Sequence, residues 1–298
     1  MFFCVVKFKR RSDEMKNTDF TIRDPFILPF EGKYYLYGTT SNTSFSVYVS
    51  CDLENWSEPV TVFEASDNFK YKYNFWAPEV HYRNGSFYLF GSFKSDDLCR
   101  ATQILKSDNP LGPFIPFTEN AQTPECWECL DGTLYIDKKG VPFMVFCHEW
   151  LQVLNGEMCY ARLSDDLSHF ITEPKLMFKA NDYPVVAPSN WHEQDGYVTD
   201  GPFMHRCKNG ELLMIWSSNH YVGNVKKYCQ IILKSDNSEI DGNWIYEGML
   251  FEDDGGHGML FKDFDGNLKL CLHQPNKLNE HLEIFNVSEK DGKLSIIK

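Results

Sequence analysis

Five times along the chain, a polar turn that contains glycine leads into a short run of aromatic and aliphatic residues. The runs begin at Gly32, Gly85, Gly140, Gly210 and Gly266, and successive glycines lie 53, 55, 70 and 56 residues apart. Glycine accepts the positive φ that a tight hairpin requires, so each run is predicted to be a β-strand entered through a hairpin turn. The spacing therefore indicates a chain built from repeats.

A second pattern follows each of the first four runs, where serine and aspartate stand together a few residues before an aromatic residue. The four segments are 50–53 with Trp56, 107–108 with Phe114, 164–167 with Phe170, and 235–236 with Trp244. Serine and aspartate side chains bond nearby backbone and favour turns. Together the patterns predict an all-β fold, a five-bladed β-propeller over residues 20–298, after a tail over residues 1–19. An all-β sandwich is the alternative fold.

An ionisable residue precedes each glycine turn by six to ten positions, namely Asp24, Glu79, Asp131, Asp200 and His257. Because the first strand of each propeller blade lines the central channel, we expect these five side chains to face one axis. Gathering four carboxylates and an imidazole is costly unless a ligand, a cation or catalysis requires it. The pattern predicts a functional site in the channel, where Glu79 is expected to contact substrate or support the structure.

Four further residues beside the channel, together with Glu149, are candidates for substrate binding. Arg23 is either a substrate ligand or a local ion-pair partner, and Trp76 is either a platform for a sugar ring or a core residue. Glu149 ends a strand in a polar cluster that is either a pocket rim or a solvated strand end. Trp191 and His192 lie in a long loop, and long loops in compact domains are often functional.

Composition narrows the class of partner. The net charge of −13 argues against nucleic-acid binding, which needs basic patches. No apolar stretch is long enough to span a membrane. The ten cysteines stand mostly in apolar surroundings and predict no disulfide scaffold, which, with a poor secretion signal at the N-terminus, favours a cytoplasmic location. We expect a monomer.

Five short segments, one in each predicted blade, resemble glycoside hydrolase family 43, the five-bladed propeller glycosidases. They are 23–25 (Arg-Asp-Pro), 76–80 (Trp-Ala-Pro-Glu-Val), 130–131 (Leu-Asp), 200–203 (Asp-Gly-Pro-Phe) and 256–258 (Gly-His-Gly). The resemblance implies that Asp24 is a general base and that Asp131 orients the acid and tunes its pKa. The family's acid is usually a glutamate before Gly-Pro. Here Asp200, one methylene shorter, takes that position, and Glu79 and Glu149 are alternative acids.

The resemblance implies an inverting glycosidase that acts on arabinofuranosyl or xylosyl linkages of plant polysaccharides, so the expected partner is a carbohydrate. Inversion needs an acid and a base on opposite faces of the sugar, about 6.5–9.5 Å apart. No cofactor is required. By the same resemblance, His257 is expected to lie near a structural calcium or sodium ion in the channel, held through water.

Two other functions stay open. Segment 127–129 is similar to the acid/base motif of the invertase-like propellers of family 32, which would make Asp24 a nucleophile and Glu128 the acid/base of a retaining fructosidase. Alternatively, because Asp200 departs from the family's glutamate, the propeller binds carbohydrate without cleaving it.

Overall fold

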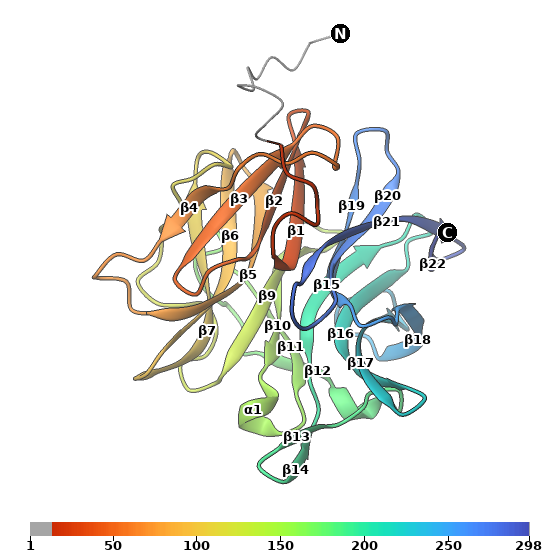
Figure 1. Ribbon diagram of the computed structural model, residues 1–298. Helices are drawn as coiled ribbons and strands as arrows, with labels where there is room; N and C mark the ends of the chain where they lie inside the picture. The colour runs from red at the N-terminus through yellow and green to blue at the C-terminus, as the bar shows by residue number, and fades with distance from the viewer. Residues whose placement is uncertain (1–13, 298) are drawn as a thin grey trace.

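The computed structural model describes residues 14–297 and consists almost entirely of β-strands. Five sheets, each of four antiparallel strands that are consecutive in the chain, surround one axis (Figure 1). The fold is a five-bladed β-propeller, as the repeats predict.

The blades follow one another in chain order. The first contains β1 (Arg23–Phe30), β2 (Lys33–Thr39), β3 (Ser44–Ser50) and β4 (Val60–Glu64). The second contains β5 (Tyr73–Arg83), β6 (Ser86–Ser95), β7 (Leu98–Ser107) and β8 (Ile115–Pro116). The third contains β9 (Cys129–Ile136), β10 (Pro142–His148), β11 (Glu157–Arg162) and β12 (Lys175–Lys179).

The fourth blade contains β15 (Asp200–Arg206), β16 (Leu212–Val222), β17 (Val225–Ser235) and β18 (Trp244–Phe251). The fifth contains β19 (Gly256–Lys262), β20 (Leu268–Gln274), β21 (His281–Lys290) and β22 (Lys293–Ile296). Three short elements belong to no blade: the helix α1 (Trp150–Val153), the 3₁₀ turn η1 (Ala180–Asp182), and the hairpin of β13 (Ser189–Trp191) and β14 (Gln194–Gly196).

Both sequence patterns mark the turns predicted for them. The five repeat glycines lie between the first and second strands of their blades, with φ between +76° and +89°. The serine–aspartate segments lie between the third and fourth strands. In the first blade, Asp52 Oδ1 accepts the backbone N–H groups of Glu54 and Asn55 at 2.9 and 2.8 Å. Such side-chain bonds hold a turn without help from distant parts of the chain.

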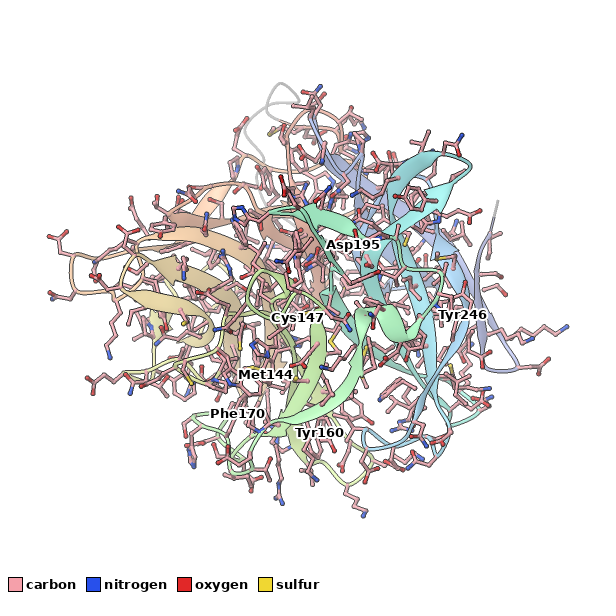
Figure 2. All side chains as sticks on the ribbon, turned by 90° about the horizontal axis from the view of Figure 1, so that it is seen from below. Met144, Cys147, Tyr160, Phe170, Asp195 and Tyr246 are labelled. Carbon is pink, nitrogen blue, oxygen red and sulfur yellow. The ribbon has the colours of Figure 1, made fainter. Side chains whose placement is uncertain are left out.

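Apolar side chains fill the space between neighbouring sheets. Met144 and Cys147 of β10 are fully buried, whereas Tyr246 of the outer strand β18 is 42% exposed (Figure 2). The inner strands therefore supply the continuous core. Each sheet is covered on both faces by its neighbours, and the outermost strands meet solvent.

The ring closes between the fifth and first blades without a shared strand. β21 and β22 complete the fifth blade, as predicted. One apolar cluster joins Ile27 of β1 to Met259 and Phe261 of β19. Beside it, the N–H of Ile22 donates to the carbonyl of Glu280 at 2.9 Å. Side-chain packing and a few loop contacts therefore hold the two ends of the ring together.

The last residues of the predicted tail contact the first blade. Met15 and Trp56 exchange two backbone hydrogen bonds of 2.9 Å, which attach this segment to the first blade. Residues 1–13 of the predicted tail lie outside the described part. Within that part, no helix has the length and apolar character needed to cross a bilayer. Its nine cysteines are free thiols.

Candidate active site

Every blade carries the same irregularity near the start of its first strand. The ladder between the first two strands shifts register there, and the residue at the shift has a positive φ. These residues are Asp24 (φ 52°), Ala77 (46°), Asp131 (55°), Gly201 (49°) and His257 (49°). A β-bulge turns a side chain out of the regular alternation, and non-glycine residues in this region cluster at functional sites. Three of the five bulged residues, Asp24, Asp131 and His257, line one cavity.

A cavity of about 420 Å³ lies where these bulges meet. Seven of the residues expected from the sequence line it: Arg23, Asp24, Trp76, Asp131, Glu149, Asp200 and His257. Thr39, Leu130 and Trp150 complete the lining. Three acids from three separate blades therefore reach one cavity, as the spacing in the sequence predicts.

Asp24 is held as a carboxylate. Its Oδ2 accepts the hydroxyl of Thr39 at 2.7 Å, and its Oδ1 lies 3.2 Å from Nδ1 of His257. Burial favours the neutral form, but the neighbouring His257 and Arg23 outweigh burial, so the pKa of Asp24 lies below its ordinary value. This group can accept a proton at any pH above the acidic range.

Asp131 is almost completely buried, with 5% of its surface exposed. Its Oδ2 accepts the N–H of Gly201 at 3.0 Å, and its own N–H donates to Ser92 Oγ at 2.8 Å. Burial and the negative charge of Asp24 raise the pKa of Asp131 well above its ordinary value. Since Gly201 follows Asp200 directly, the bond also fixes the backbone beside the third acid.

Asp200 favours the protonated form near neutral pH. It begins β15 and is partly buried, and its Oδ2 accepts the hydroxyl of Tyr228 at 3.0 Å. Burial and the proximity of Asp131 raise the pKa of Asp200 to about 7, against the opposing influence of His257. Two carboxyl groups in one cavity thus have pKa values displaced in opposite directions, the usual sign of an acid and a base.

His257 lies between two of the acids. Its Nδ1 is 3.2 Å from Asp24 Oδ1 and 3.9 Å from Asp131 Oδ2. The backbone N–H of His257 donates to Ser217 Oγ at 2.7 Å. Calcium requires six to eight oxygen ligands around one point. The imidazole nitrogen instead faces a carboxylate, which suits a hydrogen bond better than cation binding. The calcium or sodium ion expected near His257 stays a prediction.

The lining of the cavity also combines aromatic and charged groups. The guanidinium of Arg100 stacks on the ring of Trp76 at 3.9 Å, and its Nε donates to Glu149 Oε2 at 3.2 Å. Burial raises the pKa of Glu149, although the neighbouring Arg100 opposes this. Arg23 bonds the carbonyl of Asn276 at 2.6 Å and pairs with Glu280, so it serves as a local ion-pair partner that also lines the cavity.

Glu79 does not line the cavity with the other four axial residues. β5 shifts register twice, and the bulged residue is Ala77, two positions before Glu79. The carboxylate of Glu79 instead contacts the imidazole of His81 at 3.1 Å. The second blade contributes Trp76 to the cavity lining. The contact with His81 fits the structural alternative for Glu79, and its contact with substrate stays a prediction.

Two other predicted residues, His192 and Glu128, are absent from the cavity lining. His192 is exposed, in the turn between β13 and β14. Trp191 belongs to β13, but its side chain lies outside the described residues. Glu128 accepts Lys94 Nζ at 2.5 Å and the N–H of Arg100 at 2.7 Å. Burial alone would raise the pKa of Glu128, but these bonds lower it. A lowered pKa suits a fixed carboxylate rather than an acid.

Tyr228, His273 and Trp150 have functional positions that the sequence analysis missed. Tyr228 on β17 contacts Asp200, and Nδ1 of His273 on β20 accepts the N–H of Asp24 at 3.2 Å. Burial lowers the pKa of His273 to about 4, so its ring is neutral. Trp150 begins the helix α1 on the cavity rim. Tyr228 follows two lysines and His273 ends an apolar run, and no motif marks either residue.

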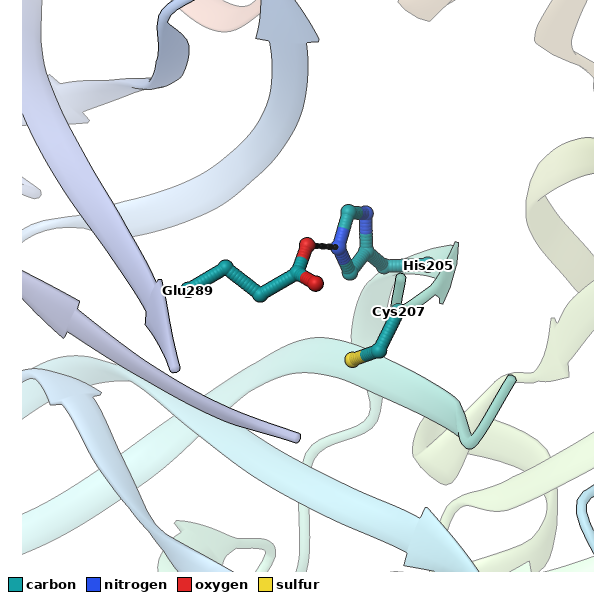
Figure 3. A group of neighbouring side chains, drawn as sticks. All are labelled: His205, Cys207 and Glu289. Carbon is teal, nitrogen blue, oxygen red and sulfur yellow. Dashed lines mark hydrogen bonds and ion pairs between the residues drawn. The ribbon is translucent and has the colours of Figure 1, made fainter. Parts of the chain in front are cut away.

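Outside the channel, one group has the chemistry of a metal site. Ligand atoms of His205, Cys207 and Glu289 all lie within 4.8 Å of one another (Figure 3). However, Glu289 already bonds His205 at 3.0 Å and the N–H of Lys208 at 2.7 Å. Burial raises the pKa of Cys207 to about 12, which disfavours the thiolate that binds metals. We interpret the group as a link between the fourth and fifth blades.

Comparisons with known proteins agree with this architecture. The profile described as "Glycosyl hydrolases family 43" matches residues 18–293. The chain is 40% identical to an endo-arabinase from Bacteroides thetaiotaomicron VPI-5482, with a TM-score of 0.90 over 95% of this chain and 100% of that chain. It is 28% identical to an endo-1,4-beta-xylanase from the same organism, with a TM-score of 0.76 over 96% and 97%.

A third solved structure bears on the fold alone. It is a β-xylosidase/α-arabinofuranosidase from a compost microbial metagenome, solved with xylotriose in a calcium-free form. It is 17% identical, with a TM-score of 0.74 over 97% of this chain and 98% of that chain. Among curated proteins, no sequence matches the chain.

Proposed function

The chain belongs to glycosyl hydrolase family 43, and from this premise we propose that it cleaves arabinofuranosyl linkages within arabinan, with inversion at the anomeric carbon. The sequence left arabinofuranosyl and xylosyl linkages open. The endo-arabinase covered over its whole length at 40% identity favours arabinan over the xylan of the enzyme at 28%. The substrate class therefore rests on similarity, and the reaction rests on the cavity.

One observation carries the reaction: two carboxyl groups that line a single cavity have oppositely displaced pKa values. In this proposal Asp24 is the general base and Asp200 the general acid. Asp24 takes a proton from a water molecule, whose oxygen bonds the anomeric carbon as the glycosidic C–O bond breaks. The departing oxygen takes the proton of Asp200. Each carboxyl then returns to its starting state by proton exchange with solvent.

Neighbouring side chains support these roles. Thr39 contacts one carboxylate oxygen of Asp24 and His257 contacts the other, which orients the group and maintains its charge. Asp131 acts as the modulator, because its proximity raises the pKa of Asp200. Its bond to the N–H of Gly201 ties the acid-bearing strand to the third blade.

The aromatic wall suits a sugar ring. Trp76 and Trp150 line the same cavity as the acids, and both are partly exposed. An indole offers a broad apolar face with a polar edge, which fits the apolar faces and hydroxyl groups of a furanose. Arg100 holds Trp76 in place from behind, so the platform is rigid before substrate arrives.

The retaining fructosidase reading fits less well. It requires Glu128 as acid/base, yet this residue is absent from the cavity lining and is paired with Lys94. A lysine and a backbone N–H stabilise the charged carboxylate, so such a group loses its proton already at low pH. The contacts of Glu128 are instead those of a structural residue.

The test is the configuration of the first product, followed by proton NMR during hydrolysis of linear arabinan oligosaccharides. An inverting enzyme releases the opposite anomer before mutarotation, and release of the retained anomer would contradict the proposal. Xylan oligosaccharides in parallel test the substrate class. If the wild type binds arabinan but cleaves neither polymer, the non-catalytic reading wins.

A further inference from the structure

We propose that Tyr228 is the positioning residue that makes the short acid Asp200 effective, by fixing one carboxyl oxygen so that the other presents its proton to the cavity. This inference rests on the proposed function, since it assigns a role relative to the general acid.

The hydroxyl of Tyr228 contacts the acid directly. It donates to Asp200 Oδ2 at 3.0 Å, and the tyrosine is 97% buried, with 3% of its surface exposed. Burial and the proximity of Asp200 raise the pKa of Tyr228 well above its ordinary value, so the hydroxyl is a donor throughout the working pH range. A fixed donor on Oδ2 makes that oxygen the acceptor. In the protonated acid, the hydrogen then belongs on Oδ1.

The tyrosine ring packs against two paired residues of the fifth blade, His273 and Gly256. It stacks on His273 with centroids 5.7 Å apart and an interplanar angle of 22°. A Cβ on Gly256 would lie only 2.7 Å from a ring carbon of Tyr228, so glycine provides the room for this approach. A side chain confined in this way gives its hydroxyl one position, which is what a positioning group needs.

The same stack connects the acid to the base. The imidazole of His273, against which Tyr228 lies, accepts the N–H of Asp24 at 3.2 Å. The partner of the acid and the partner of the base therefore pack face to face. Their contact links the positions of the two carboxyl groups, whose separation decides whether a water fits beside the sugar.

The length of the acid explains why such support is needed. An aspartate carboxyl reaches about 1.5 Å less far than the glutamate usual in this family's motif, and a displacement of about 1 Å can cost about a hundredfold in rate. The hydroxyl of Tyr228 on β17 bonds this shorter side chain directly. Charged groups that influence Tyr228 are Asp24, Arg23, Asp131 and Asp200, and Asp254 accepts its N–H.

The experiment is Tyr228→Phe, which removes the hydroxyl and keeps the ring. We compare a linear arabino-oligosaccharide, whose leaving sugar needs a proton, with the 4-nitrophenyl glycoside of the same oligosaccharide, which does not. We expect kcat for the oligosaccharide to fall about tenfold or more, and that for the aryl glycoside to change little. Without the hydroxyl that favours the charged form, the alkaline limb of the pH profile should move to higher pH.

The matched control is Tyr37→Phe, which removes another fully buried hydroxyl, bonded to the carbonyl of Pro110 at 2.6 Å, away from the cavity. Equal losses on both substrates with an unmoved alkaline limb would overturn the positioning role. Asp200→Asn distinguishes a failure of the Tyr228 proposal from a failure of the acid assignment, because it should abolish the alkaline limb whatever Tyr228 does. If Asp200→Asn retains oligosaccharide cleavage, the acid assignment itself fails.

Asp200→Glu provides a second test should Tyr228→Phe fold poorly. The longer side chain would push the carboxyl past the hydroxyl, so we expect this variant to lose oligosaccharide cleavage preferentially, although it introduces the residue usual in the family. Full activity in Asp200→Glu would overturn the proposal.

Discussion

Replacing Asp200 with asparagine removes the proton that the proposed mechanism delivers to the leaving sugar, while the side chain keeps its shape. We expect kcat/KM for linear arabino-oligosaccharides at pH 6 to fall by about 10²–10⁴-fold, the usual contribution of general acid catalysis. The alkaline limb of the wild-type profile, expected at about pH 7 from the pKa of Asp200, should disappear in the variant.

The cavity changes the fraction of Asp200 that is protonated. With a pKa of about 7, about 90% of Asp200 is protonated at pH 6, whereas at the ordinary value of 3.8 only about 0.6% would be. The cavity thus increases the fraction of protonated acid about 140-fold at that pH. Burial is the largest cause, so opening the cavity to water should lower the pKa and the alkaline limb together.

The assay is initial rate against pH from 4 to 9, with product detected by reducing ends. Glu149→Gln is the matched control, since Glu149 lines the same cavity and burial also raises its pKa. If the limb near pH 7 persists in Asp200→Asn and vanishes in Glu149→Gln, the reasoning from pKa and position is refuted, and Glu149 becomes the acid.

Three further outcomes are expected. Asp24→Asn should lower kcat by about 10²–10⁴-fold with little change in KM and remove the acidic limb, measured by the same pH series; an unchanged acidic limb would argue against Asp24 as base. Gly201→Ala should lower the free energy of unfolding in urea by about 2 kcal/mol, because φ is +49° and a Cβ would lie 2.7 Å from the His257 ring; a change below about 0.5 kcal/mol would contradict this. Dialysis against a chelator should leave activity intact, since the His257 nitrogen faces Asp24; loss that calcium restores would favour the ion predicted beside His257.

Local signals made the fold predictable from the sequence. The repeat glycines adopt the positive φ that their turns demand, and the serine–aspartate segments satisfy their own backbone. Both features depend on a few neighbouring residues, so they can be read without knowing the rest of the chain. Asp24, Asp131 and Asp200 meet in one cavity because each stands at, or directly beside, the bulge near the start of its blade.

Glu79 occupies a different place in its repeat from Asp24. It stands six positions before Gly85, whereas Ala77 stands eight before it, as Asp24 stands eight before Gly32. The nearest ionisable residue to the expected position is therefore Glu79, two positions after the alanine. Tyr228 could not be found in this way, because it comes from a third strand and its role depends on packing between blades.

The five bulges are equivalent backbone positions, or sockets, around the axis, and they hold different residues. The backbone alone creates each one, and the side chain it displays has little part in forming the sheet. Evolution can therefore exchange an acid, an imidazole or a methyl group at one socket without redesigning a blade. In this chain the second socket holds the buried Ala77, and the neighbouring Trp76 is the residue by which this blade reaches the cavity.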